Sequence, residues 1–352
     1  HSSHRRQRQM CIRDRKLKAS TLENEGDPAA LWVYDETVSL IDKIVAGYAY
    51  EKTQKNAVEE HYGIYRQAMV ASQRFASTPN DFEHMLNIAE KSKARQLRQS
   101  YASARAKHIA GIPDSLLAKE KALKTEIIRL KRDKISAQRS GENGQTTTGR
   151  SYADQIFKLE TQLDSLREVF KKGYRNYHEL TQQFRTITTA TIRDSLLEKK
   201  QAMLHYFIAD SSIFLFVITR KSEHLFTIPL DFPLVDWVTN LHSFTSNYIK
   251  MDSRNSIQYQ FGLYKKLFQK ADSVLIKEEV DRLIIIRDGI LNMLPFDMLV
   301  RELPSPSASP RTHDFLLRYY SFAYNYSATM QKMMMDKIHQ TETTKLMVVF
   351  AP

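Results

Sequence analysis

The sequence is poor in cysteine, since Cys11 is the only one among 352 residues. A single thiol excludes an internal disulfide framework, which fits a protein of a reducing compartment. Long apolar runs are also missing, because no uninterrupted stretch approaches the roughly 20 residues that a membrane-spanning helix needs. The composition, with 42% hydrophobic and 26% charged residues, is that of an ordinary globular chain. We therefore expect a soluble, cytoplasmic protein without a membrane partner.

The glycine-rich motifs that cradle nucleotide phosphates, GxxxxGK[ST] and GxGxxG, are absent from the sequence. The stretch Gly141–Arg150 (GENGQTTTGR) contains glycines but follows a helical pattern rather than a strand, which argues against phosphate binding. Four histidines on predicted helices have no second histidine or carboxylate at a repeated metal-ligand spacing. These are His108, His178, His242 and His339. We therefore predict neither a cofactor-binding residue nor a metal site.

Several other residues that could carry chemistry have a structural interpretation. His205 and His224 lie within apolar runs, where a histidine of the core or of a sheet face is commoner than a ligand. Met333–Met335 is interpreted as the packed and exposed sides of a helix, not as a copper or haem site. Asp288 could act as an acid, but its position before Gly289 is explained by turn formation. No catalytic residue is predicted.

The net charge of +12 raises the question of nucleic-acid binding. Residues 1–18 hold seven basic residues and one acidic residue, a net charge of +6, so half of the excess lies in one short segment. Within it, Arg6–Arg15 (RQRQMCIRDR) resembles translated sequencing-adapter sequence. We interpret residues 1–18 as a non-native tail; the alternative is a basic arm that binds nucleic acid or membrane. The remaining charge is diffuse, so no nucleic-acid partner is expected.

Residues 19–110 have the pattern of an all-α helical region. Apolar residues recur every three or four positions from Asp27 to His108, and Asp81 follows a turn as a candidate N-cap. No 34-residue self-similarity can be counted, so spacing alone leaves an ordinary bundle and a solenoid of helical hairpins equally open.

Residues 111–200 are predicted to form a long helical hairpin, with Gly141–Arg150 as its flexible hinge. The second helix has apolar residues in alternating steps of four and three, which is a heptad seam, and the first helix has a matching seam. An antiparallel hairpin is the simplest result, and an intermolecular coiled coil is the alternative. The two seams consist of Tyr152, Ile156, Leu159, Leu163, Leu166 and Phe170, and of Leu116, Leu123, Ile127 and Leu130.

The period changes at about residue 201, where an α/β domain is predicted to begin and continue to 352. Met203–Leu230 contains three β-rich runs and predicts a β-meander. Helices are predicted over Leu234–Leu241 and Ile257–Gln269 and, after a cap at Ser327, to about His339. Further strands are predicted at Tyr319–Tyr324 and Lys345–Phe350.

The most informative stretch is Asp281–Val300 (DRLIIIRDGILNMLPFDMLV). Leu283–Ile286 is a short aliphatic run typical of a strand covered on both faces. Asp288 and Gly289 predict a tight turn, because glycine tolerates positive φ. Pro295 predicts an extended Leu294 and the first position of a helix, with Asp297 complementing its dipole.

These residues resemble the first half of a CHAT domain, the caspase-like domain that bacteria couple to tetratricopeptide repeats. Arg287 replaces the proline usual in that family, and Asp297 replaces a glutamate. The resemblance extends over four further segments. They are Ala89–Leu97, Gly111–Leu117, Leu263–Phe268 and Asp314–Met330.

The resemblance implies that residues 19–110 are degenerate tetratricopeptide repeats that bind a protein partner. It also implies a cysteine peptidase in which a histidine takes the proton of a thiol that attacks a peptide carbonyl. In the family this histidine precedes a glycine, and none of the eleven histidines here does. We expect the chain to be a fragment that stops before both catalytic residues and is inactive by itself. The alternative is a non-catalytic interaction scaffold.

Overall fold

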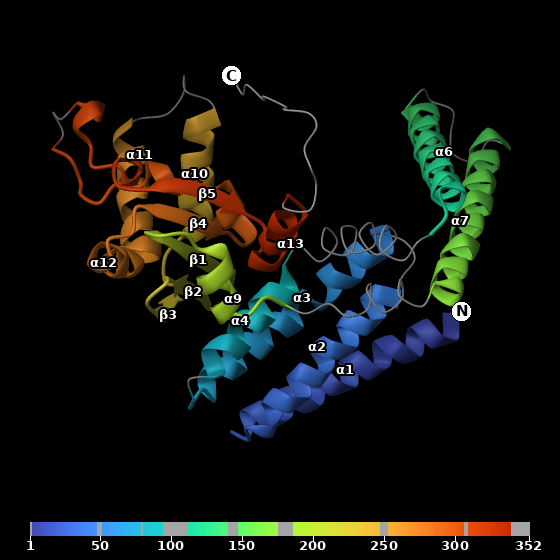
Figure 1. The fold of residues 1–352 in the computed structure, drawn as a ribbon, viewed down its shortest axis with the longest axis horizontal. Coiled ribbons are helices and arrows are strands. Elements are labelled where there is room, and N and C mark those ends of the chain that lie inside the picture. The colour runs from blue at the N-terminus through green and yellow to red at the C-terminus, as the bar shows by residue number, and fades with distance from the viewer. Residues whose placement is uncertain are drawn as a thin grey trace. The chain divides into compact units, whose positions relative to one another are not determined.

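In a computed structural model of the protein, most of the chain is described, including all five strands of one sheet (Figure 1). Its contacts divide it into two compact units. The first comprises residues 1–38, 62–94 and 186–352, and the second comprises 39–61 and 95–185. The first unit thus combines the predicted α/β domain with parts of the predicted helical region. The described residues are 2–47, 51–78, 80–93, 112–139, 147–174, 186–246, 253–305 and 309–338.

The sheet has the strand order β3-β2-β1-β4-β5. The first three strands form the predicted antiparallel meander, while β1, β4 and β5 run parallel to one another. The predicted strand Leu283–Ile286 is confirmed as β4, which pairs on both sides. The strands are β1 (Gln201–Ile208), β2 (Ser212–Ile218), β3 (Glu223–Pro229), β4 (Arg282–Ile286) and β5 (Ser321–Asn325).

One face of the sheet carries the main hydrophobic core. Leu204 and Tyr206 of β1 and Ile285 of β4 pack there against α10 (Leu234–Ser246) and the following helices. The predicted helices in this region are confirmed, although Ile257–Gln269 is part of a longer helical segment. Gly262 allows close approach to α10, because a Cβ there would lie 2.6 Å from the Trp237 ring. The segment consists of α11 (Ser253–Leu263), a π-helical turn η2 (Tyr264–Phe268) and α12 (Gln269–Lys277).

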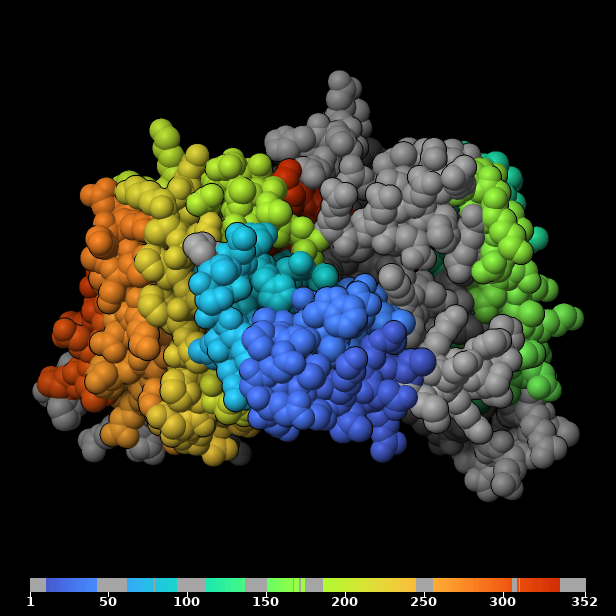
Figure 2. Space-filling view, turned by 90° about the horizontal axis from the view of Figure 1, so that it is seen from below, coloured from blue at the N-terminus to red at the C-terminus, as the bar shows by residue number. Residues whose placement is uncertain are grey.

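The opposite face is covered by α3 and α4. The ring centres of Phe207 and of Tyr62 on α3 lie 6.2 Å apart, and those of Phe216 and of Phe82 on α4 lie 5.4 Å apart. Figure 2 shows residues 62–93, in light blue, against residues 186–246, in yellow-green to yellow. Side chains of β1 therefore meet two different partners, because alternate residues of a strand point to opposite faces.

The helices at the start of the chain include the segment that we predicted to be a tail. Residues 1–18 fall within α1 apart from His1, and Ile12 in this segment is buried. Asp81 does not cap α4; its carboxylate accepts the N–H groups of Ser77 and Thr78, which precede the helix. The helices are α1 (Ser2–Asn24), α2 (Ala29–Gly47), α3 (Glu51–Arg74) and α4 (Asn80–Ser92).

The second unit contains the predicted helical hairpin, formed by α6 (Asp114–Arg139) and α7 (Thr147–Gly173). Leu123, in the first half of α6, packs in one cluster with Phe170 near the end of α7, and Lys131, in the second half of α6, pairs with Glu160 of α7 at 2.8 Å. These contacts confirm an antiparallel arrangement. Of the predicted hinge, residues 147–150 are helical and 141–146 lie outside the described residues.

The chain after β4 differs from the prediction. Pro295 does not begin an α-helix; it precedes a single 3₁₀ turn, η4 (Phe296–Met298), because Leu299 returns to an extended backbone with φ −66° and ψ 144°. Asp297 accepts a hydrogen bond from the Tyr324 hydroxyl at 2.9 Å, which binds the turn to β5. The extended conformation of Leu294 is confirmed, with φ −85° and ψ 117°.

The remaining elements are short, apart from the last helix, α13. Ser327 caps this helix as predicted, since its Oγ accepts the N–H of Met330 at 3.0 Å. His339 and the predicted strand Lys345–Phe350 lie outside the described residues. These elements are α9 (Thr189–Thr191), the π-helical turn η1 (Ile192–Leu196), the 3₁₀ turns η3 (Gly289–Met293), η5 (Pro310–Thr312) and η6 (Leu316–Arg318), and α13 (Ala328–Ile338).

Candidate functional site

The parallel strands β1 and β4 end side by side, and the chain turns sharply after β4. Gly289 has φ +48°, which confirms the predicted need for glycine in the turn. A Cβ at this position would also lie 3.3 Å from Cδ1 of Ile208, the last residue of β1. Ligand sites of α/β sheets generally lie at the carboxyl ends of such strands. A ligand site is therefore expected at this carboxyl edge, which is formed by Tyr206–Ile208 and Arg287–Gly289.

Asp288 does more at this edge than form a turn. Its Oδ2 accepts the N–H of Ile208 at 2.7 Å, and both carboxylate oxygens lie 3.0 to 3.1 Å from the hydroxyl of Tyr62. The predicted turn is confirmed, but turn formation explains only part of what Asp288 does. Tyr62 lies 226 residues away in the sequence, so no local pattern could indicate this partner.

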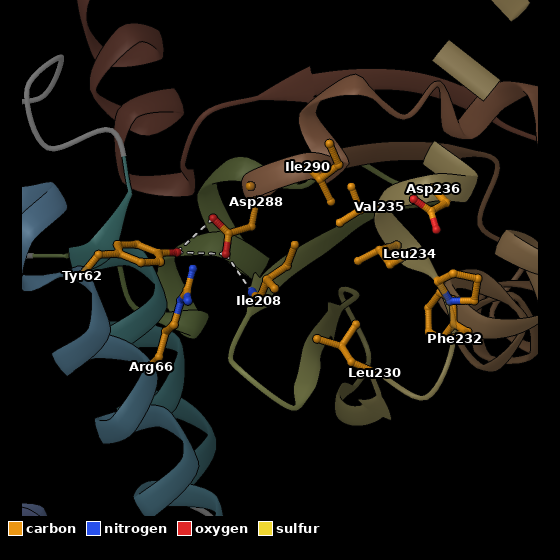
Figure 3. A pocket seen from close by; sticks show the side chains of 12 residues that line it. Tyr62, Arg66, Ile208, Leu230, Phe232, Leu234, Val235, Asp236, Asp288 and Ile290 are labelled. Carbon is orange, nitrogen blue, oxygen red and sulfur yellow. Dashed lines mark hydrogen bonds between the residues drawn. The ribbon is translucent and has the colours of Figure 1, made fainter. Parts of the chain in front are cut away.

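A cavity of about 590 Å³ opens beside this turn (Figure 3). Its wall is apolar over most of its extent, with aliphatic side chains from β1, the loop after β3 and the start of α10. The polar groups Tyr62, Arg66 and Asp288 gather at one end, and Asp236 lies at the other (Figure 3). An apolar pocket with a few convergent polar groups is the usual form of a small-ligand site. The apolar lining consists of Ile208, Leu230, Phe232, Pro233, Leu234, Val235 and Ile290.

The charges at the polar end of the cavity already have partners. The Arg66 guanidinium binds Asp210 at 2.8 Å and lies over the Tyr62 ring, 5.0 Å from its centre. Burial, followed by the negative charge of Asp288, raises the pKa of Tyr62. The phenol therefore keeps its proton and donates to Asp288.

Behind the turn lies a buried charge cluster, formed by Glu90, Lys93, His205 and Asp288. Glu90, on α4, is fully buried. Its Oε1 accepts from Nε2 of His205 at 3.0 Å and from the N–H of Ala328 at 2.9 Å. Its Oε2 accepts from the N–H and the hydroxyl of Thr329, at 2.9 and 2.6 Å. One carboxylate thus binds β1 and the first turn of α13, where the helix dipole favours negative charge.

Lys93 supplies the positive charge of this cluster. It is 6% exposed, and its Nζ donates to the carbonyl oxygen of Tyr206 and, at 2.8 Å, to that of Arg287. The Asp288 carboxylate lies 4.0 Å away. Burial lowers the pKa of Lys93, while Asp288 and Glu90 oppose that shift. The two acids thus provide the negative charge that a buried ammonium group needs.

His205 is confirmed as a core histidine with a partner. Burial, followed by the positive charge of Lys93, lowers its pKa, so the ring is neutral and donates from Nε2 to Glu90. Its Nδ1 is buried without a hydrogen-bond partner, which fits a bare ring nitrogen. His224 has the expected sheet-face position and contacts the Ser222 hydroxyl at 2.9 Å.

A second group, Ser72, His84 and Asp35, is connected in the same way as the serine, histidine and aspartate of a serine hydrolase triad, but it cannot act as one. Nδ1 of His84 lies 3.3 Å from the Ser72 hydroxyl, and Nε2 lies 2.9 Å from Oδ1 of Asp35. Ser72 is only 2% exposed and donates its proton to the carbonyl of Ala68, one turn back in α3. A nucleophile must reach its substrate, so this group is structural. The sequence reasoning missed it, because its members come from three helices.

The other predicted residues do not gather at this site. Cys11 is exposed on α1, and His242 lies on α10. Met334 is exposed and its two methionine neighbours on α13 are half-buried, as predicted. His108 and His178 lie outside the described residues.

In the part of the chain that the structure describes, no group of three or more histidine, cysteine, aspartate or glutamate side chains could hold a metal ion. No helix in the same part has the length and apolar character required to cross a bilayer.

In comparisons of the whole chain with known proteins, no protein-family model matches it and no curated protein matches it.

Proposed function

We propose that this chain is part of a CHAT-type protein, a caspase-like cysteine peptidase of the cytoplasm whose helical repeats bind a protein partner. The observation that carries the proposal is the unit Arg282–Gly289, a strand with parallel neighbours on both sides followed by a turn that requires glycine. It stands in the stretch that resembles a CHAT domain. A mixed sheet with helices on both faces is compatible with that fold.

In this proposal the catalytic cysteine and histidine belong to a part of the protein that follows Pro352. The carboxyl edge would then contribute the pocket wall and not the nucleophile. A thiolate needs a base within hydrogen-bond reach and donors for the oxyanion. Cys11, exposed on α1, has no role in the proposed chemistry.

A second candidate, a non-catalytic interaction scaffold, is favoured by one observation. Glu90, Lys93, His205 and Asp288 stand at or behind the edge where chemistry would be expected, yet they bind one another and the backbone. Groups used in this way hold helices on a sheet and do not process a substrate.

The reading frame beyond the codon of Pro352 separates the two candidates. The peptidase requires a strand followed by His-Gly and then a cysteine-bearing strand, and the complete protein should react with a thiol-directed peptide probe at that cysteine. The present chain should react only nonspecifically, at Cys11, and Cys11→Ala is the control. A continuing frame without that histidine and cysteine would overturn the peptidase and leave the scaffold.

A further inference from the structure

We infer that Glu90, in the last turn of α4, and Lys93, the residue that follows α4, are positioning residues that hold the carboxyl edge, and with it the wall of the adjacent cavity, in its observed shape. Only the statement that this edge serves a peptidase rests on the proposed function. The positioning itself follows from contacts in the first unit and can be tested without any activity.

Lys93 acts where the pairing of two strands stops. The register of β1 with β4 ends at His205 opposite Ile286. The next two residues, Tyr206 and Arg287, direct their carbonyl oxygens to the Lys93 ammonium group. The side chain of Lys93, the residue that follows α4, therefore joins the strands just past their last paired residues, at the point where the chain enters the turn.

The Lys93 charge also orders the turn itself. The Asp288 carboxylate, 4.0 Å from the Lys93 ammonium, accepts the N–H of Ile208 and the hydroxyl of Tyr62. Both Tyr62 and Asp288 line the cavity (Figure 3). Loss of the ammonium group would leave Asp288 as a buried carboxylate without its counter-ion, which destabilises the observed position of that side chain.

Glu90, in the last turn of α4, performs a separate task. Its carboxylate joins His205 of β1 to the first two residues of α13. These bonds go to β1 and to the start of α13, whereas those of Lys93 go to the end of β1 and to the turn after β4. The two residues should therefore stabilise different segments. Lys93 should hold residues 286–293 in place, and Glu90 should hold the start of α13 in place.

Hydrogen exchange of the full chain, followed by mass spectrometry at pH 7.5, tests this division. In Lys93→Met, which keeps the stem and removes the charge, amides of 286–293 should exchange at least about tenfold faster. That factor corresponds to the loss of one net interaction. In Glu90→Gln the increase should fall on 328–338. Strands β2 and β3 should stay protected in both variants.

His84→Gln is the matched control. It changes a residue of α4 that binds the Asp35 carboxylate of α2 and that makes no bond to the carboxyl edge among those described above. It should leave 286–293 and 328–338 unchanged. Two results would overturn the inference: faster exchange confined to α4 itself in Lys93→Met, or an equal increase throughout the sheet. Either would reduce Glu90 and Lys93 to ordinary stabilising residues, and neither depends on whether the protein is a peptidase.

Discussion

Two histidine–carboxylate pairs of almost equal length lie on the two sides of α4. His205 binds Glu90 at 3.0 Å and both side chains are 0% exposed, whereas His84 binds Asp35 at 2.9 Å with side chains 32% and 47% exposed. The pKa of His205 is lowered, first by burial and then by the charge of Lys93. The pKa of His84 is raised, first by its hydrogen bond to Asp35. Burial and neighbouring charge, not the type of pair, therefore decide the sign of the shift.

The comparison also shows which pair the fold depends on. Glu90 joins three elements of the sheet unit, and water cannot replace its bonds. Asp35 and His84 keep access to solvent, which screens their attraction and can solvate either partner when the other is lost. The predictions below test this difference.

The largest effect is expected from Glu90→Ala, which removes the acceptor of two backbone N–H groups, a hydroxyl and His205. Breaking a buried charge network by removing one partner costs about 3–5 kcal/mol. Urea unfolding should show this loss in the free energy of unfolding. Asp35→Ala, the matched change in the solvated pair, should cost less than about 1 kcal/mol. Equal losses would show that burial does not separate the two pairs.

Gly289→Ala should have the next largest effect, because the left-handed backbone costs a non-glycine residue about 1–2 kcal/mol. The change strains the edge beside the buried pair and leaves the solvated pair untouched. Gly63, in α3, is the control, since nothing lies within 4 Å of a Cβ placed there. Gly63→Ala should stabilise the protein by up to about 1 kcal/mol. Thermal unfolding of both variants measures whether each change raises or lowers the stability. A stabilising Gly289→Ala would contradict the strained turn.

The two histidines should respond to pH in opposite directions. The folded pKa of His205 lies below its unfolded value of about 6.5, so the unfolded chain binds more protons and stability falls as the pH drops below 6.5. The folded pKa of His84 lies above that value, so its contribution is full below pH 6.5 and is lost as the pH rises through the folded pKa.

Unfolding free energies at pH 5.5 and 8 should therefore separate the variants. The cost of His205→Gln should shrink toward acid, and the cost of His84→Gln should grow. One proton changes the stability by at most about 1.4 kcal/mol per pH unit, and the solvated His84 pair should reach less of it. Parallel pH profiles for the two variants would contradict the opposite pKa shifts of the two histidines.

The smallest effect is expected from charges that are solvated completely. Replacing the exposed Arg13, Arg15, Lys16 and Lys18 by glutamine lowers the net charge from +12 to +8 and spares the buried Ile12. Stability should hardly change. The variant should bind duplex DNA no better than a neutral protein at physiological salt. A log–log salt slope of about −5 or steeper would restore the nucleic-acid interpretation.

The sequence by itself determined the elements whose signals are local. The meander, β4, the glycine turn and the cap at Ser327 depend on β-branched runs, on φ and on one hydroxyl, which act within a few residues. The hairpin seam from Leu123 to Phe170 follows from helical periodicity. The helix predicted after Pro295 failed because Tyr324 of β5 binds Asp297 and the backbone of Phe296, a competition that no local rule contains.

Only the tertiary structure decided the polar interior of the site. Glu90 meets His205 from 115 residues away, and Tyr62 meets Asp288 from 226 residues away. A carboxylate or an ammonium at the end of a helix has the same pattern in sequence whether water or protein surrounds it, so the sequence gives Glu90 and Lys93 the pattern of ordinary surface residues. Their partners are set by which face of the sheet the helix covers, and burial then makes each missing partner costly.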